Sequence, residues 1–146
     1  MAFRFRLGGL LGVREKLENQ KKNEYGRAVA ELERQKHVRA EISERQSEGL
    51  ESFRDAARER PSPGELLLYG GYMARLRSDA ARQDKAVSEA ARAADERREE
   101  LIERMRDRKA LETLRDRKRE EYNEAEKRSE QKISDEVGSY RFFRGE

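Results

Sequence analysis

The sequence contains no cysteine, only two prolines and few hydrophobic residues, which make up 34% of its 146 residues. Without cysteine the chain has neither a disulfide framework nor a thiolate for catalysis, and this composition fits a reducing compartment. No apolar run approaches the ~18 residues that a membrane-spanning helix needs. These absences argue against a disulfide-stabilised domain and a transmembrane segment, and we expect a soluble, cytoplasmic protein.

The N-terminal stretch MAFRFRLGGLLGVREKLE lacks the features of an export signal. Its apolar part, LGGLLGV, is barely long enough for one, and Arg14 and Glu15 follow at once with no small-residue cleavage site. A signal peptide is therefore not expected. The chain also contains no G-x-x-x-x-G-K-[ST] phosphate loop, so we expect no ATP binding by this chain on its own.

Charged residues make up 45% of the chain, with 34 basic and 31 acidic side chains and a net charge of +3. The remaining apolar material is too scarce for a compact globule of this length. Disorder is one interpretation of such a composition. The balanced charge and the many helix-favouring residues instead indicate long helices that each bury a narrow stripe. The sequence therefore predicts an all-α, coiled-coil fold.

One strong break interrupts the helical sequence, at RPSPG over residues 60–64. Pro61 cannot continue a helix, because it lacks the amide donor and clashes with the preceding turn. Ser62 is suited to cap a new helix with Pro63 at its first position. A short break of this kind usually joins two antiparallel helices, although the glycine pair at Gly70 is a second candidate for the bend.

We expect a single coiled-coil domain over residues 1–146, a long antiparallel two-helix hairpin with a C-terminal helix overhang. Its parts are helix one at about 4–59, a turn at 60–64, helix two at about 65–138 and a flexible tail at 139–146. Insertions near Lys21 and Gln46 are expected to unwind the first seam locally. That seam consists of Leu7, Leu10, Arg14, Leu17, Lys21, Tyr25, Ala28, Leu32, Gln35, Arg39, Ile42, Gln46, Leu50, Phe53 and Ala57. The second seam follows strict heptads from Tyr69 to Leu101 and then blurs.

The second helix is longer than the first, so it overshoots its partner and both chain ends lie at the same end of the hairpin. The overhang begins near Glu121 with EYNEAEKRSEQKISDE and carries Tyr122, Ile133 and Val137. A helix that lacks an intramolecular partner but keeps apolar residues is a candidate for binding another protein. The last residues, GSYRFFRGE, are typical of a frayed tail with two exposed phenylalanines.

The sequence shows no catalytic constellation. Its single histidine, His37, lies amid charged helical sequence and is expected to be a solvated surface residue. Acidic pairs such as Glu99 and Glu100 have no enclosed pocket in a two-helix fold that would tune their pKa values. We therefore expect no enzymatic activity, no cofactor and no metal site.

A basic segment allows three interpretations. Residues 104–119 hold eight basic and three acidic side chains, and basic helices can lie along phosphate backbones. Residues 120–136 reverse the sign with seven acids and three bases, and no aromatic residues interleave with the arginines. A solvated face with i,i+4 charge pairs is the leading interpretation, an acidic protein partner the second and nucleic acid the third. We expect no nucleic-acid partner.

Four short motifs follow one another along nearly the whole chain. They are F-x-F-x-L-x-x-L-L-x-x-R at residues 3–14, Y-x-x-x-L at 72–76, R-x-A-L-E-x-L at 108–114 and E-Q-K-x-x-D-E at 130–136. In order and spacing the chain resembles the FliJ proteins of the bacterial flagellar export apparatus. From these motifs and the overhang, the residues expected to bind partners are Phe3, Phe5, Leu7, Leu10, Arg14, Tyr72, Leu76, Leu111, Leu114, Tyr122, Gln131, Lys132, Ile133, Asp135 and Glu136.

The resemblance implies a small antiparallel coiled coil, similar to the central stalk of rotary ATPases. It implies binding to the hexameric flagellar export ATPase, promotion of its assembly or activity, contact with the membrane export gate and assistance to export chaperones. Such a protein would be non-catalytic and peripheral at the cytoplasmic face of the inner membrane. Two alternatives stay open, namely the analogous stalk or scaffold of a virulence-type secretion system and a general helical adaptor or chaperone.

The resemblance also suggests a role for the N-terminal residues. Residues 3–11 would begin the first helix and pack against residues 111–122, and would form neither a signal peptide nor a β-strand. Their apolar side chains would seal the helix pair, while Arg4, Arg6 and Arg14 would face acidic groups on a ring. The alternative is that these residues only cap the end of the coiled coil.

Overall fold

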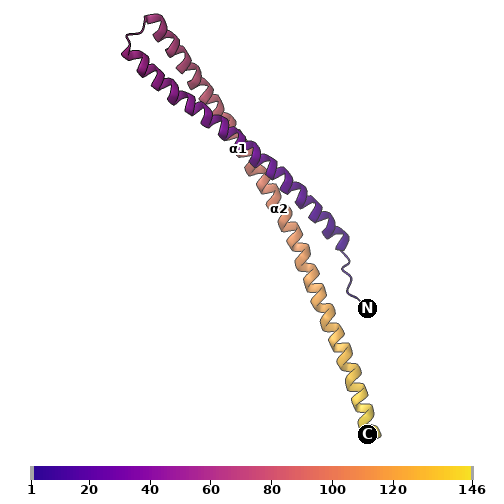
Figure 1. The fold of residues 1–146 in the computed structure, drawn as a ribbon. Coiled ribbons are helices and arrows are strands. Elements are labelled where there is room, and N and C mark those ends of the chain that lie inside the picture. The colour runs from indigo at the N-terminus through magenta and orange to yellow at the C-terminus, as the bar shows by residue number, and fades with distance from the viewer. Residues whose placement is uncertain (1, 146) are drawn as a thin grey trace. The chain divides into compact units, whose positions relative to one another are not determined.

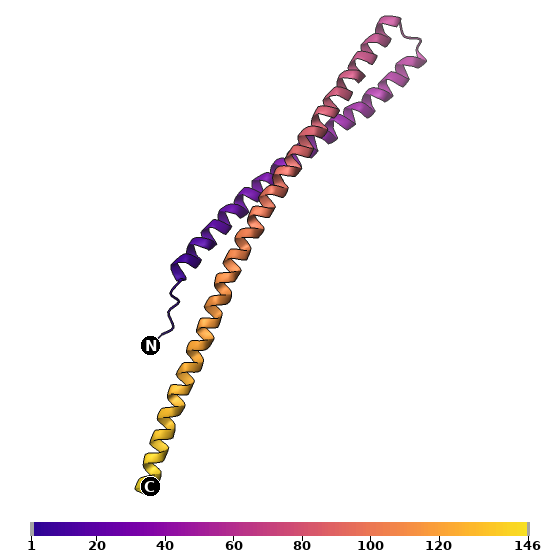
Figure 2. The same cartoon turned by 180° about the vertical axis from the view of Figure 1, so that it is seen from behind.

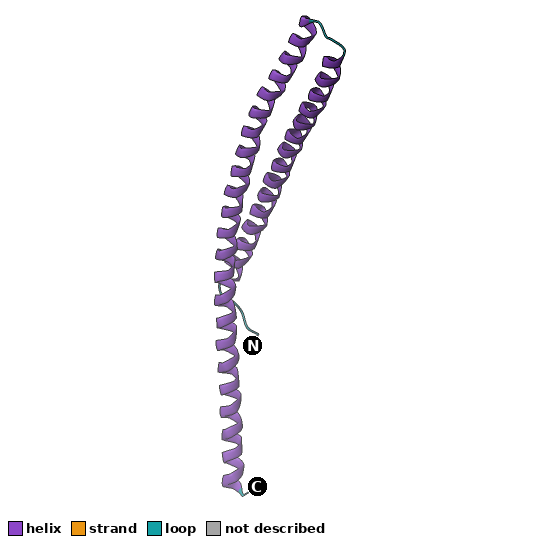
Figure 3. Cartoon of the chain, turned by 90° about the vertical axis from the view of Figure 1, so that its left-hand side faces the viewer, coloured by secondary structure: helices purple, strands orange, loops and turns teal. Residues whose placement is uncertain are grey.

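The computed structural model describes residues 2–145, which form two helices joined by a short turn (Figure 1). Helix α1 spans Gly8–Arg58 and helix α2 spans Pro63–Arg144, and no strand occurs among the described residues (Figure 3). The predicted all-α class is confirmed. The chain divides into a terminal unit, Met1–Gln20 with Ile102–Glu146, and a hairpin unit, Lys21–Leu101. The expectation of one domain stays a prediction.

In the hairpin unit, α1 and α2 run antiparallel on either side of the turn (Figure 2). The Ser62 hydroxyl accepts a hydrogen bond from the Glu65 amide at 3.3 Å, and Pro63 is the first helical residue. Arg60 adopts a φ of 55°, in the left-handed region where a chain reverses sharply. The predicted cap is confirmed, and the break lies before Pro63, because Gly70 is inside α2.

The face that α1 buries follows an unbroken heptad pattern. The buried and half-buried residues that fall on the heptad positions are Leu11, Arg14, Glu18, Lys21, Tyr25, Ala28, Leu32, Gln35, Arg39, Ile42, Gln46, Gly49, Phe53 and Ala56. The predicted insertions are wrong: before Lys21 the buried residue is Glu18, with Leu17 only half-buried, and after Gln46 it is Gly49, with Leu50 exposed. The seam also contains Leu11, which is 5% exposed, in place of Leu10, which is 42% exposed. Charged residues at heptad positions such as Glu18 hide the true register from a search for apolar residues.

Small residues bring the two helices together in the hairpin unit. On α2 the buried residues include Ala80 and Ala94, and Gly49 on α1 is also buried. A Cβ atom added at Gly49 would lie 2.9 Å from Met73 Sδ, so the backbone of α1 closely approaches α2 at this point. A two-helix fold with few apolar residues depends on such close approaches, because dispersion contacts weaken steeply with distance.

The start of α1 and the end of α2 both differ from the predicted bounds. α1 begins at Gly8 rather than near residue 4, and residues 2–5 belong to no regular element. α2 runs to Arg144 rather than ending near residue 138, so most of the expected flexible tail is helical. Gly145, with a φ of 71°, donates its amide hydrogen to the Phe142 carbonyl at 3.2 Å. Glycine in this left-handed conformation is a common end of a helix.

Candidate partner-binding site

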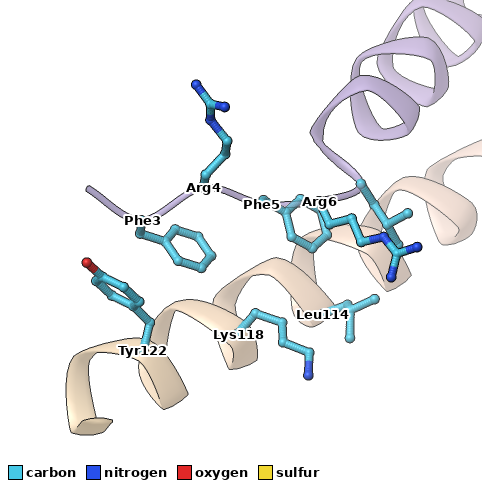
Figure 4. Close-up of a pocket in the computed structure, with 8 residues that line it drawn as sticks. Phe3, Arg4, Phe5, Arg6, Leu114, Lys118 and Tyr122 are labelled. Atoms are coloured by element: carbon cyan, nitrogen blue, oxygen red, sulfur yellow. The ribbon is translucent and has the colours of Figure 1, made fainter. Parts of the chain in front are cut away.

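In the terminal unit, an N-terminal segment at residues 3–7 lies along α2 (Figure 4). Its three apolar side chains are half-buried and its two arginines are exposed. The ring centroids of Phe3 and Tyr122 are 5.7 Å apart, and Leu114 lines the same groove. The predicted packing against residues 111–122 is therefore confirmed, although the segment is not helical. Alternating apolar and cationic residues favour an extended chain, which places all the apolar side chains on one side.

Cationic and phenolic groups border this groove. The Arg119 guanidinium carbon lies 5.5 Å from the centroid of the Phe3 ring, within the range of a cation–π contact. The Tyr122 hydroxyl donates a hydrogen bond to Glu126 Oε1 at 2.9 Å, and this bond is the main cause of the raised pKa of Tyr122. Lys118 also lines the groove. Apolar rings and cations thus lie side by side at the N-terminal segment.

Next to the groove, the terminal unit contains an ionic cluster. Glu18 is only 3% exposed and its carboxylate pairs with Arg108, whose guanidinium also contacts Glu112 at 2.8 Å. Glu18 first and Glu112 second raise the pKa of Arg108. Arg14 lies 3.5 Å from Asp107, so part of its charge is balanced within the chain. A buried charge such as that of Glu18 is tolerable only because its partner is in place.

A second ionic cluster joins the helices in the hairpin unit. The Lys21 ammonium lies 3.1 Å from both Glu24 and Glu100, and Arg97 lies 3.2 Å from the same two carboxylates. Lys21 first and Arg97 second lower the pKa of Glu100. An ionised carboxylate between two cations has the arrangement of a structural ion pair rather than of a catalytic acid.

Beyond the groove, α2 continues without cover from the rest of the terminal unit. From Asn123 to Arg144 the chain is helical and every residue is exposed. Tyr122, Ile133 and Tyr140 lie on one side of α2, because eighteen residues make about five helical turns and eleven make about three. Five residues predicted to bind partners occupy this segment: Gln131, Lys132, Ile133, Asp135 and Glu136.

The remaining predicted residues have different surroundings. Leu111 is half-buried in the terminal unit, and Leu10 is largely exposed there. In the hairpin unit Tyr72 is exposed, whereas Leu76 is 4% exposed and packs inside the helix pair. The five predicted residues that the fold brings together at one groove are Phe3, Phe5, Leu7, Leu114 and Tyr122.

Sequence reasoning missed an apolar patch at the start of α2. Leu67 is 77% exposed, Leu68 is similarly exposed, and Tyr72 borders the same surface. The signal was available in the sequence, because three consecutive leucines after a helix cap cannot all face one narrow seam.

The described residues contain neither a metal site nor a membrane-spanning helix. Within residues 2–145, no group of histidine and acidic side chains is arranged to hold a metal ion. No helix in the described part of the chain combines the length and apolar character required to cross a membrane. His37 is exposed, with its Nε2 atom 3.2 Å from Glu41.

Comparison with known proteins agrees with the resemblance in the motifs. The flagellar FliJ protein family matches residues 3–146. A solved structure described as a putative YscO homologue from Chlamydia trachomatis is similar at 16% identity over 94% of each chain, with a TM-score of 0.48. A search of curated proteins gave no match. The family match covers almost every residue, so the chain belongs to the FliJ family of flagellar export components.

Proposed function

We propose that this protein is a non-catalytic component of flagellar export that binds the hexameric export ATPase and promotes its assembly or activity. In this proposal it acts as a stalk-like coiled coil, contacts the export gate at the cytoplasmic face of the inner membrane, and assists export chaperones. The proposal extends membership of the FliJ family to the partners that the family resemblance implies.

One observation carries the proposal, namely the uncovered stretch of α2 after Tyr122. Residues 123–144 are helical but have no neighbouring segment among residues 2–145 to bury their apolar side chains. Most helical stability in proteins comes from packing of an apolar face, and this stretch of α2 has no such packing among the described residues. Ile133 is 59% exposed, and Val137, one turn further on, is 47% exposed. They are well placed to pack against a partner protein.

The test is a pull-down combined with an ATPase assay, using the full chain and the purified export ATPase. The test variant carries Ile133→Glu and Val137→Glu, which place charge on the apolar stripe. The control carries Ser134→Glu and Ser139→Glu, which add the same charge at exposed positions of the same segment. We expect wild type and control to co-purify with the ATPase and stimulate hydrolysis. The test variant should bind at least about tenfold more weakly, because two apolar contacts are lost.

The proposal fails if the wild-type chain neither co-purifies with the ATPase nor changes its rate. Equal losses in the test and control variants would show that added charge, rather than the apolar stripe, causes the effect. That result would remove residues 133–137 from the proposed interface.

A further inference from the structure

The groove beneath the N-terminal segment combines an apolar floor with cations and has room for a ligand. Its cavity volume is about 640 Å³. The floor consists of Phe3, Phe5, Leu7, Leu114 and Tyr122, and the remaining lining residues are Arg4, Arg6 and Lys118. No acidic residue lines it within the described part of the chain. An apolar cleft with cations at its border is suited to an apolar side chain that has carboxylates beside it.

The arginines of the segment are free to meet such a ligand. Neither Arg4 nor Arg6 pairs with a carboxylate among residues 2–145, and both are exposed. Figure 4 shows Phe3 on the side of the segment that faces α2 and Arg4 directed away from it. Lys118 lies 3.3 Å from Glu121 in an exposed pair, which a competing carboxylate can replace at little cost. Arg4, Arg6 and Lys118 can therefore each form an ion pair with a carboxylate of a bound ligand.

We infer that this groove binds an acidic amphipathic segment of a partner protein, with an apolar side chain inserted between the N-terminal segment and α2. Glutamates or aspartates next to that side chain would face Arg6 and Lys118 at the groove and Arg4 on the outer side of the segment. The inference goes beyond the proposed function, because it states the chemistry of the bound segment and applies to any partner that carries one. It uses the groove and not the uncovered helix at residues 123–144.

The surroundings of the groove favour a peptide over a nucleic acid. Residues 120–136 contain seven acidic and three basic side chains, and Glu126 is already bonded to Tyr122 at the groove. A phosphate backbone continuing along α2 would meet this acidic stretch, whereas a short peptide ends before it. The half-buried rings of Phe3 and Phe5 also offer an apolar contact that a phosphate does not use.

The test measures fluorescence anisotropy of a labelled synthetic peptide with the full chain. The peptide is about four helical turns long, with leucines and one phenylalanine on one face and glutamates elsewhere. A second peptide replaces every glutamate with glutamine, and a labelled duplex DNA is a third probe. The groove variant carries Arg4→Glu and Arg6→Glu. The charge-matched control carries Arg92→Glu and Arg98→Glu, two exposed arginines of the hairpin unit.

We expect the acidic peptide to bind wild type and control within about twofold of each other, and the groove variant at least about tenfold more weakly. The glutamine peptide should bind more weakly than the acidic one, and added salt should narrow that difference. Phe5→Ala should also weaken binding, which tests the apolar floor without changing charge. Circular dichroism confirms that each variant keeps its helices.

Three results overturn the inference: no binding of the acidic peptide, equal loss in groove variant and control, or equal binding of the two peptides. Duplex DNA that binds more tightly than the peptide and depends on Arg4 and Arg6 would assign the groove to nucleic acid instead. None of these measurements includes the export ATPase. A negative result with the peptides would therefore not contradict the proposed function. A failure to co-purify with the ATPase would likewise not contradict peptide binding at the groove.

Discussion

Phe3 packs against Tyr122 with a ring-centroid separation of 5.7 Å and an interplanar angle of 52°. This tilted contact joins the N-terminal segment to α2, at the last half-buried residue of that helix. Before Tyr122, α2 has half-buried residues that pack against other parts of the terminal unit. After Tyr122, every described residue of α2 is exposed. The contact therefore marks the boundary between the packed coiled coil and the segment proposed to bind a partner.

Loss of the Tyr122 ring should release the N-terminal segment without melting the helices. An aromatic pair contributes about 0.5–1.5 kcal/mol beyond its buried area, so Tyr122→Ala should raise the rate of tryptic cleavage after Arg4 and Arg6 about two- to tenfold. Mass spectrometry of the released N-terminal peptides measures this rate. Tyr140→Ala is the control, because Tyr140 is exposed on α2 and contacts Arg144. Equal cleavage of the two variants would contradict the packing of the segment.

Loss of the buried ion pair between Glu18 and Arg108 should lower the stability of the fold more than loss of an exposed ion pair. Glu18→Ala leaves the Arg108 charge without its main partner, so the melting temperature should fall further than in Glu33→Ala, which removes an exposed carboxylate 3.5 Å from Lys36. Replacement of both Glu18 and Arg108 by leucine should recover most of the loss, because an apolar pair at heptad positions needs no desolvation of charge. Thermal melts by circular dichroism give the comparison. A double variant less stable than Glu18→Ala would refute this account of the pair.

Two glycines should respond oppositely to alanine. Gly70 lies inside α2 with nothing within 4 Å of an added Cβ, so Gly70→Ala should raise the free energy of unfolding by about 0.5–1 kcal/mol. At Gly49 the new Cβ would lie 2.9 Å from Met73 Sδ and 3.2 Å from Tyr72 Cε1, so this gain should be cancelled or reversed. Urea unfolding followed by circular dichroism measures both. Equal stabilisation would show that the Met73 and Tyr72 side chains move aside at no cost, and would contradict the predicted difference.

Acid should weaken the Lys21–Glu100 contact between the helices. Lys21, and then Arg97, hold the pKa of Glu100 below its ordinary value of 4.5 in the folded chain. A carboxyl with a lowered folded pKa stabilises the fold above its unfolded pKa, and that stability is lost as the pH falls below 4.5 towards the folded value. The melting temperature of wild type should therefore exceed that of Glu100→Gln near neutral pH, and this difference in melting temperature should disappear in acid. Glu99→Gln, which removes an exposed neighbour, should show no such difference.

The central break and the helical class were predictable because their signals are local. Pro61 stops a helix, and Ser62 followed by Pro63 starts one, whatever the distant surroundings. The seam was harder to place, since the heptad positions of the terminal unit hold Arg14, Glu18 and Arg108, whose pairing depends on both helices. A search for apolar residues then chose Leu10 in place of Leu11.

The candidate site was only partly predictable for a related reason. The two-residue alternation of Phe3, Arg4 and Phe5 is the pattern of an extended chain, and the family resemblance led instead to a helical start. The second helix was expected to end near residue 138, with a frayed tail after it, whereas the helix continues to Arg144 and ends at Gly145 with a left-handed φ. The groove itself requires a neighbouring surface, and no pattern within residues 3–7 reveals that Tyr122 supplies it.

Hydrogen–deuterium exchange of residues 123–144 with and without the export ATPase tests the central claim most directly. In the free chain these amides should exchange quickly, because a helix with no packed face opens often. On addition of a saturating amount of ATPase they should become strongly protected, while the amides around Gly70 serve as an internal reference. Slow exchange in the free chain, or unchanged exchange in the presence of bound ATPase, would contradict the claim that this helix is held in place by a partner.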